Sequence, residues 1–183
     1  MKATKLIALT VPVLLLFGCG VGDKDSTPKT QDIFKKKVVL SEKQYPNYIC
    51  EQMVEFQFVK KDGYLIKMGE FIKEDSKTDV ILDSVDEIEE TVKAIENIEA
   101  PAKYQDQQKV MLKGASELRK GLDLIRESSK KDKDSFKESV ARLMENLSVA
   151  YLDYWEPTTK ELSKYDPDAY GKALDKLMKE HAK

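Results

Sequence analysis

Two cysteines and one histidine are the residues that could support nucleophilic catalysis. A thiol nucleophile needs a general base within hydrogen-bond reach, and the single imidazole in the 183-residue sequence belongs to His181. Cys50 stands among apolar residues of a predicted helix, where a cysteine usually acts as a small buried hydrophobe. One histidine also excludes a metal centre built on several imidazoles. We therefore predict no catalytic residue and a protein that is not an enzyme.

Acidic residues form two groups that could hold a metal ion, and neither has the pattern of a metal site. The Asp and Glu residues at positions 79–90 lie opposite the apolar stripe of a predicted helix, which is typical of a solvated face. The run at positions 166–171 begins like a calcium loop. Pro167 occupies its second position, however, and Leu177 stands where that loop requires a bidentate carboxylate. We predict no metal site.

The densest group of aromatic residues is Tyr151, Tyr154 and Trp155, close to Pro157. Large amphipathic side chains are favoured contact residues at protein interfaces, so these three residues form the candidate contact patch. They could equally fill one end of a helical bundle. For Trp155 we expect this buried position.

An apolar run near the start of the sequence has the features of a secretory signal. Lys2 and Lys5 precede the run, which extends over Leu6–Phe17. A membrane-spanning helix needs roughly 20 apolar residues, so this run is too short to cross a bilayer. A basic segment followed by a short apolar segment predicts an export signal over residues 1–18.

A cysteine follows directly after this segment, in the sequence Leu16-Phe17-Gly18-Cys19. These residues resemble the lipobox of bacterial lipoprotein precursors. The resemblance implies cleavage before Cys19 and covalent attachment of a diacylglycerol lipid, with fatty acids such as palmitate, to its thiol. It places the protein on the extracytoplasmic face of the cell membrane, and the Lys-rich composition together with Gly20 favours a Gram-positive cell. The alternative is an ordinary secretory signal that is cut nearby.

The remainder of the chain divides into a tether and one domain. Residues 19–40 begin with a polar stretch rich in Gly, Ser and Thr that shows no apolar period. Such a composition is typical of a flexible linker. Residues 41–183 carry the apolar residues at helical spacing, and they are enough for a single domain with its own core. We predict a signal over 1–18, a tether over 19–40 and a helical domain over 41–183.

Helical periodicity recurs along this domain. The positions that share one helix face are Ile81, Val85, Ile88, Val92 and Ile95 in one segment, Tyr104, Met111, Ala115, Leu118, Leu122 and Ile125 in the next, and Phe136, Val140, Leu143, Leu147, Ala150 and Tyr154 in a third. Pro157 is expected to break or kink the third segment. A short terminal helix follows, with Tyr170, Leu174, Leu177 and Met178 facing inward.

The segment Tyr45–Lys73 can be read in two ways. Alternating apolar residues on either side of Lys61-Asp62-Gly63 are typical of a β-hairpin. As a helix, the same segment gathers most of its large apolar residues on one side. An isolated hairpin is marginally stable and the rest of the chain offers no further strands, so we favour the helix, with Gly63 as its weak point.

These elements predict an all-α fold. Amphipathic helices joined by short connections bury their stripes as an antiparallel up-and-down four-helix bundle, here with a short additional C-terminal helix. The stretches Glu99–Tyr104 and Lys109–Ala115 weakly resemble uncharacterised helical-bundle lipoproteins of Gram-positive bacteria. This resemblance agrees with the fold and implies no activity.

Charge gives no indication of nucleic-acid binding. The sequence has 31 Lys and Arg against 33 Asp and Glu, whereas a nucleic-acid surface needs a clustered basic excess. We predict a membrane-anchored cell-surface lipoprotein that acts as a non-enzymatic interaction module for a protein or envelope partner. The alternative is a small-ligand carrier with an apolar pocket between helices, lined by Met53, Met111, Tyr104 or Tyr154. A closed core would favour the module, and a cavity of several hundred Å³ would favour the carrier.

Overall fold

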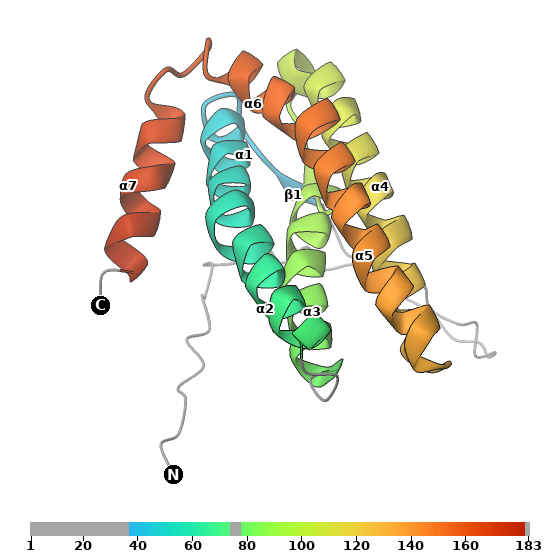
Figure 1. Ribbon diagram of the computed structural model, residues 1–183. Helices are drawn as coiled ribbons and strands as arrows, with labels where there is room; N and C mark the ends of the chain where they lie inside the picture. Colours follow the sequence, from blue (N-terminus) through green and yellow to red (C-terminus); the bar gives the residue numbers. More distant parts are fainter. Residues whose placement is uncertain (1–36, 74–77, 182–183) are drawn as a thin grey trace, which may run out of the picture. The chain divides into compact units, whose positions relative to one another are not determined.

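Long amphipathic helices build the protein and bury their apolar stripes against one another (Figure 1). The computed structural model describes residues 37–73 and 78–181, all of which belong to one unit of the chain. The predicted signal, the lipobox and Cys19 lie outside these residues. The all-α prediction is confirmed, with helices over most of the described residues and one short strand pair.

The first long helix is formed by α1 (Gln44–Glu55), a π-helical segment η1 (Phe56–Lys61) and α2 (Asp62–Lys73). It begins with a reciprocal pair of bonds, because the Ser41 amide donates to Gln44 Oε1 and the Gln44 amide donates to Ser41 Oγ. The helical interpretation of Tyr45–Lys73 is therefore confirmed and the hairpin is wrong. Gly63 does not interrupt the helix.

The next two helices are α3 (Thr78–Glu96) and α4 (Gln105–Ser128), separated by a short 3₁₀ turn, η2 (Ala102–Tyr104). The predicted stripe of α3, from Ile81 to Ile95, is fully buried, and the predicted stripe of α4 is buried from Met111 to Ile125. These helices pack on each other, α2 packs on α3, and α4 packs on the helix that follows.

The last long helix joins α5 (Lys133–Val149), a second π-helical segment η3 (Ala150–Trp155) and α6 (Glu156–Leu162). The Asp132 carboxylate caps it by accepting the Ser135 amide at 2.9 Å. Pro157 was expected to break or kink the helix; it does not end it, because η3 continues directly into α6. Pro157 stands in the first turn of α6, directly after η3, which is a position where helices tolerate proline.

A two-residue strand, β1 (Val38–Val39), pairs in parallel with β2 (Ile98–Glu99) between α3 and α4. The Val38 amide donates to Asn97 O at 2.8 Å, and the Leu40 amide donates to Glu99 O at 3.2 Å. This pair was not predicted, because two residues are too short to show an alternating pattern. The strand β1 lies within the residues predicted as a tether, 19–40.

The C-terminal helix α7 (Ala169–His181) packs beside α1 (Figure 1). Their contact is a small separate cluster in which Cys50 and Val54 of α1 face Ala169 and Ala173 of α7. Lys176 adds an ion pair to Glu51 at 2.7 Å. Met178, predicted to face inward, is 56% exposed. Met178 lies on the outer side of α7, because α7 packs mainly on α1 and one helix covers only a narrow stripe of its surface.

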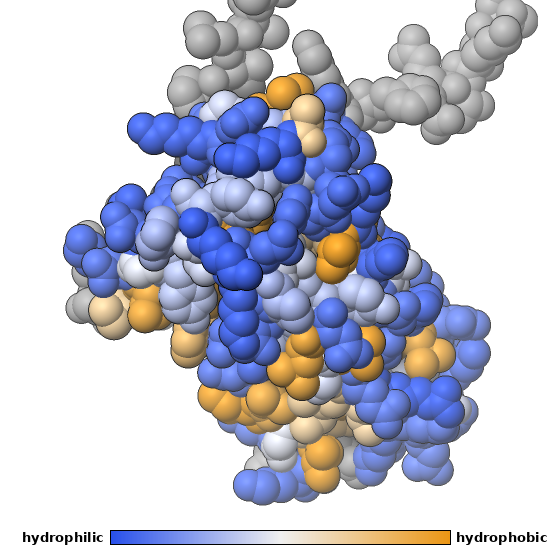
Figure 2. Space-filling model, turned by 90° about the horizontal axis from the view of Figure 1, so that it is seen from above, coloured by the Kyte–Doolittle hydropathy of each residue, from blue (hydrophilic) through white to orange (hydrophobic). Residues whose placement is uncertain are grey.

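Seen from above, the surface is mostly hydrophilic and shows apolar residues in separate small patches (Figure 2). The largest apolar side chains are inside. Trp155, Tyr45, Tyr64, Phe56 and Phe71 are among the largest fully buried residues of the described part of the chain. The core is thus closed and aromatic along the helices that carry the π-helical segments.

Candidate functional site

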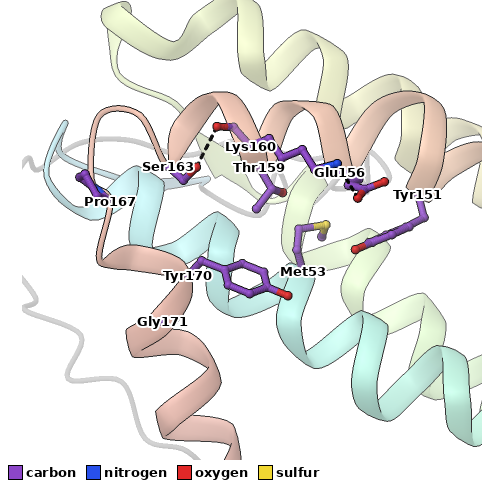
Figure 3. A pocket seen from close by; sticks show the side chains of 9 residues that line it. All are labelled: Met53, Tyr151, Glu156, Thr159, Lys160, Ser163, Pro167, Tyr170 and Gly171. Carbon is purple, nitrogen blue, oxygen red and sulfur yellow. Dashed lines mark hydrogen bonds and ion pairs between the residues drawn. The ribbon is translucent and has the colours of Figure 1, made fainter.

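A pocket of about 360 Å³ opens where α1, η3, α6 and the start of α7 meet (Figure 3). Met53 contributes from α1 and Tyr151 from η3, and their side chains and that of Tyr170 from α7 point toward one another. The remaining lining residues are Glu156, Thr159, Lys160, Ser163, Pro167 and Gly171. Four elements therefore build this site: η3, α6 and α7 follow one another along the chain, and α1 comes from a distant part of the sequence.

The π-helical segment η3 decides which of its aromatic residues reaches the pocket. The widened turn inserts one residue into the helical register, so the buried positions move from the predicted Tyr154 to Trp155. Trp155 is fully buried, donates its indole N–H to Met111 O at 2.9 Å and meets Phe56 edge-on. Tyr151, one turn earlier, is then left at the pocket wall.

A close approach of two helices holds Trp155 in place. The indole lies against Gly114 of α4, where an added Cβ would come within 2.3 Å of Trp155 Nε1. Glycine is required here because any side chain would overlap the ring. The anchored indole in turn fixes the backbone of η3 on which Tyr151 stands.

Tyr151 is oriented by residues of η1. Its ring stacks on Phe56 with the centroids 6.2 Å apart, and its hydroxyl donates to Gln57 Oε1. Lys61 places its ammonium 5.3 Å from the ring centroid. Burial, together with the negative charge of Glu156, raises the pKa of Tyr151 to about 12. Tyr151 therefore stays a neutral phenol at physiological pH.

Hydroxyl groups of α6 line the upper wall of the pocket. Thr159 Oγ1 donates to Trp155 O at 2.8 Å. Ser163 Oγ donates to Lys160 O at 2.8 Å (Figure 3). Glu156 and Lys160 form an ion pair of 2.7 Å one helical turn apart. The wall therefore carries two hydroxyl oxygens with free lone pairs and one carboxylate.

The predicted contact patch is divided by the structure. Tyr151 lines the pocket, Tyr154 is half-buried and does not line it, and Trp155 is inside the core. The expectation that Trp155 is buried is confirmed. Its membership of a contact patch is wrong, since a fully buried side chain cannot touch a partner.

Residues proposed for an inter-helix cavity have different positions. Met53 lines the pocket, whereas Met111 and Tyr104 are packed in the core. Sequence reasoning missed Tyr170, Thr159 and the Glu156–Lys160 pair. Tyr170 was assigned to an inward helix face. The four-residue spacing of Glu156 and Lys160 was the sequence signal that could have predicted their ion pair.

Cys50 lies under α7 and is fully buried, as predicted. Burial raises the pKa of its thiol to about 11. The nucleophilic thiolate is therefore a very small fraction at neutral pH.

Within residues 37–73 and 78–181, no group of three or more His, Cys, Asp or Glu side chains could hold a metal ion. None of the helices in this part of the chain is long and apolar enough to span a membrane.

The fold and the pocket define a helical-bundle protein with a surface site. The chain belongs to the family described as a domain of unknown function, DUF7018, whose model matches residues 37–157. No curated protein and no solved structure matches it. The match includes the lining residues Met53, Tyr151 and Glu156. The other lining residues lie beyond it: Thr159, Lys160, Ser163, Pro167, Tyr170 and Gly171.

Proposed function

We propose that the protein is a membrane-anchored cell-surface lipoprotein that acts as a non-enzymatic interaction module. A lipid on Cys19 holds it at the extracytoplasmic face of a Gram-positive membrane. Its four long helices serve as an antiparallel up-and-down scaffold, and α7 completes a contact site on the side of that scaffold. The partner is a protein or another component of the cell envelope, and no nucleic acid is involved.

The position of the pocket carries this proposal. The inner residues of the helices, such as Met111, Leu118 and Leu143, are fully buried and form a closed core. The pocket of about 360 Å³ lies instead at the surface, between α1, η3, α6 and α7. A closed core with a surface hollow leaves the site open to a projecting group of a partner.

The buried thiol supports the absence of catalysis in this proposal. Cys50 has no access to solvent and its pKa is raised to about 11, so it is a poor nucleophile. The pocket itself offers hydroxyl groups that already donate to the helix, and an exposed ion pair.

A second candidate function is the binding of a free small ligand. The pocket volume of about 360 Å³ favours it, since small-molecule sites begin at roughly 300 Å³. Met53 at the floor and Tyr151 at the wall would contact the apolar part of such a ligand.

In-cell cross-linking tests the interaction module and its site. Photoreactive p-benzoylphenylalanine replaces Lys160 at the pocket or, as a matched control, the exposed Asp83 of α3. We expect a discrete cross-linked product from position 160 in intact cells and none from position 83. No product from either position would contradict an interaction module, and equal products would contradict the pocket as its contact site.

The lipid anchor is tested separately. We expect Cys19→Ala to leave the precursor uncleaved and without fatty acid when cells are grown with labelled palmitate. Palmitate attached to the variant would show that Cys19 is not the acceptor.

A further inference from the structure

Several polar groups of the pocket lining can accept hydrogen bonds. Three of its hydroxyl groups direct their proton to acceptors inside the protein: Tyr151 to Gln57, Thr159 to Trp155 O and Ser163 to Lys160 O. A hydroxyl oxygen that donates its proton in this way keeps its lone pairs for another donor. A complementary group is therefore one that donates several hydrogen bonds.

An ammonium group already occupies part of this environment. Lys160 Nζ lies 2.7 Å from Glu156 Oε1 at the pocket wall, and the Lys160 side chain is 72% exposed. An exposed ion pair one helical turn apart contributes little stability. Another ammonium can therefore displace Lys160 from Glu156 at small cost.

The rest of the pocket suits a cation on an apolar stem. Met53 and the edges of Tyr151 and Tyr170 converge beside the acceptors (Figure 3). Tyr151 already has one ammonium, that of Lys61, 5.3 Å from its ring centroid, which is within the range of cation–π attraction. The volume of about 360 Å³ is at the low end for ligand sites, which fits a single side chain.

We propose that this pocket binds the side-chain ammonium of a lysine presented by the partner. Glu156 accepts the ammonium, the hydroxyl oxygens of Thr159 and Tyr151 complete its hydrogen bonds, and Met53 contacts the methylene stem. The inference rests on the proposed function, because it names the chemistry by which the interaction module recognises its partner.

The test is a titration of the purified full chain with Nα-acetyl-lysine N-methylamide. Binding is measured by NMR chemical-shift changes and by calorimetry. The Nε-acetylated derivative and N-acetylglucosamine serve as neutral probes. We expect the lysine probe alone to bind, with shifts at Tyr151, Thr159 and Tyr170. Binding of the acetylated probe with equal affinity, or of the sugar alone, would overturn the proposal, as would no binding.

Two substitutions give opposite expected signs. Glu156→Gln removes the carboxylate, so we expect affinity for the lysine probe to fall about tenfold or more. Lys160→Gln removes the internal competitor and should raise affinity about twofold. Glu117→Gln is the matched control, because Glu117 forms a similar ion pair of 2.7 Å with Lys120 on α4. Unchanged binding in Glu156→Gln, or weaker binding in Lys160→Gln, would contradict the assignment.

The ligand and the proposed function can fail independently. Cross-links from position 160 without binding of the lysine probe would overturn the ammonium assignment and leave the interaction module in place. Probe binding without any cross-link in cells would contradict the interaction module. Circular dichroism of each variant checks that the helices remain folded, which is expected because Glu156 and Lys160 are not in the core.

Discussion

Two pairs of helices in this protein hold together by different means. The first pair, α3 and α4, is regular throughout and is joined by a buried apolar stripe and by ion pairs. Glu89 of α3 contacts Arg126 and Arg119 of α4. The second pair, residues 44–73 and 133–162, contains the π-helical segments η1 and η3 and is joined by aromatic contacts around Phe56.

The difference shows what a π-helical segment provides. In the first pair each buried position follows from the helical repeat, and the surface beside it is an ordinary charged face. In the second pair the widened turns shift the register, so that Trp155 enters the core and Tyr151 is left beside a hollow. The pocket occurs on the irregular pair, as is common for π-helical turns near functional sites. The predictions below test whether the two pairs differ in this way.

The largest effect is expected from Trp155→Ala. The indole is fully buried and hydrogen-bonded to Met111 O, so the substitution should lower the free energy of unfolding by about 3–5 kcal/mol. Urea denaturation measures it. An unchanged midpoint would mean that the aromatic packing of the second pair contributes nothing, and the contrast with the first pair would fail.

Gly114→Ala tests the close contact between Gly114 and the indole of Trp155. The new methyl would lie 2.3 Å from Trp155 Nε1, so we expect a loss of about 1–3 kcal/mol by overpacking. In the Trp155→Ala background the same change should cost much less, because the indole is gone. A double-mutant cycle compares the loss of unfolding free energy in the two backgrounds. Equal losses would show that the indole does not lie against Gly114.

Glu89→Gln tests the ion pairs of the first pair. Hydrogen bonding to Arg126 is the main cause that lowers the pKa of Glu89 to about 2. The depressed pKa means that the carboxylate stabilises the fold above its ordinary pKa of 4.5 and that this contribution is lost as the pH falls toward 2. We expect Glu89→Gln to cost about 1–2 kcal/mol at pH 7.

The same substitution has a pH signature. The difference in unfolding free energy between the native protein and Glu89→Gln should shrink between pH 4.5 and pH 2, since protonated Glu and Gln are both neutral. Denaturation curves at several pH values give this difference. A constant difference across the range would show that the charge of Glu89 is not what stabilises the pair.

The smallest effect is expected at Gly63, where η1 meets α2. No atom lies within 4 Å of the position that a Cβ would occupy. Gly63→Ala should therefore raise stability by about 0.5–1 kcal/mol, because glycine is a poor residue in a helix interior. A thermal melt measures the gain. Destabilisation would indicate that the π-helical segment needs the freedom of this glycine.

The regular pair was predictable from sequence in detail. The 4-3 spacing of apolar residues from Ile81 to Ile95 identifies the buried face of α3, because this local pattern needs no information from the rest of the chain. The predicted inward positions of both helices from Ile81 and from Met111 are accordingly buried. Helix type at Tyr45–Lys73 also followed from the gathering of large apolar residues on one side.

The irregular features were not predictable in the same way. The register shift at η3 depends on how Trp155 fits against Gly114, which is a contact between residues 41 positions apart in the sequence. The pocket depends on α7 lying beside α1, and that contact is made by the small residues Ala169 and Ala173, which give a weak hydrophobic period. The β1–β2 pair is two residues long. Each of these features is set by tertiary contacts.

The strand pair would have a mechanical consequence if the chain is anchored ahead of Val38, as proposed above. Tension applied to the chain ahead of Val38 meets β1 before it meets α1. Under a pull along β1, the bonds from Val38 and Leu40 to the α3–α4 connection lie across the strand and share the load in shear. The force is then transmitted to the regular helix pair, and α1, which carries Met53, is shielded from it. In the anchored state proposed above, the strand pair would therefore take up tension before it reaches α1 and the pocket.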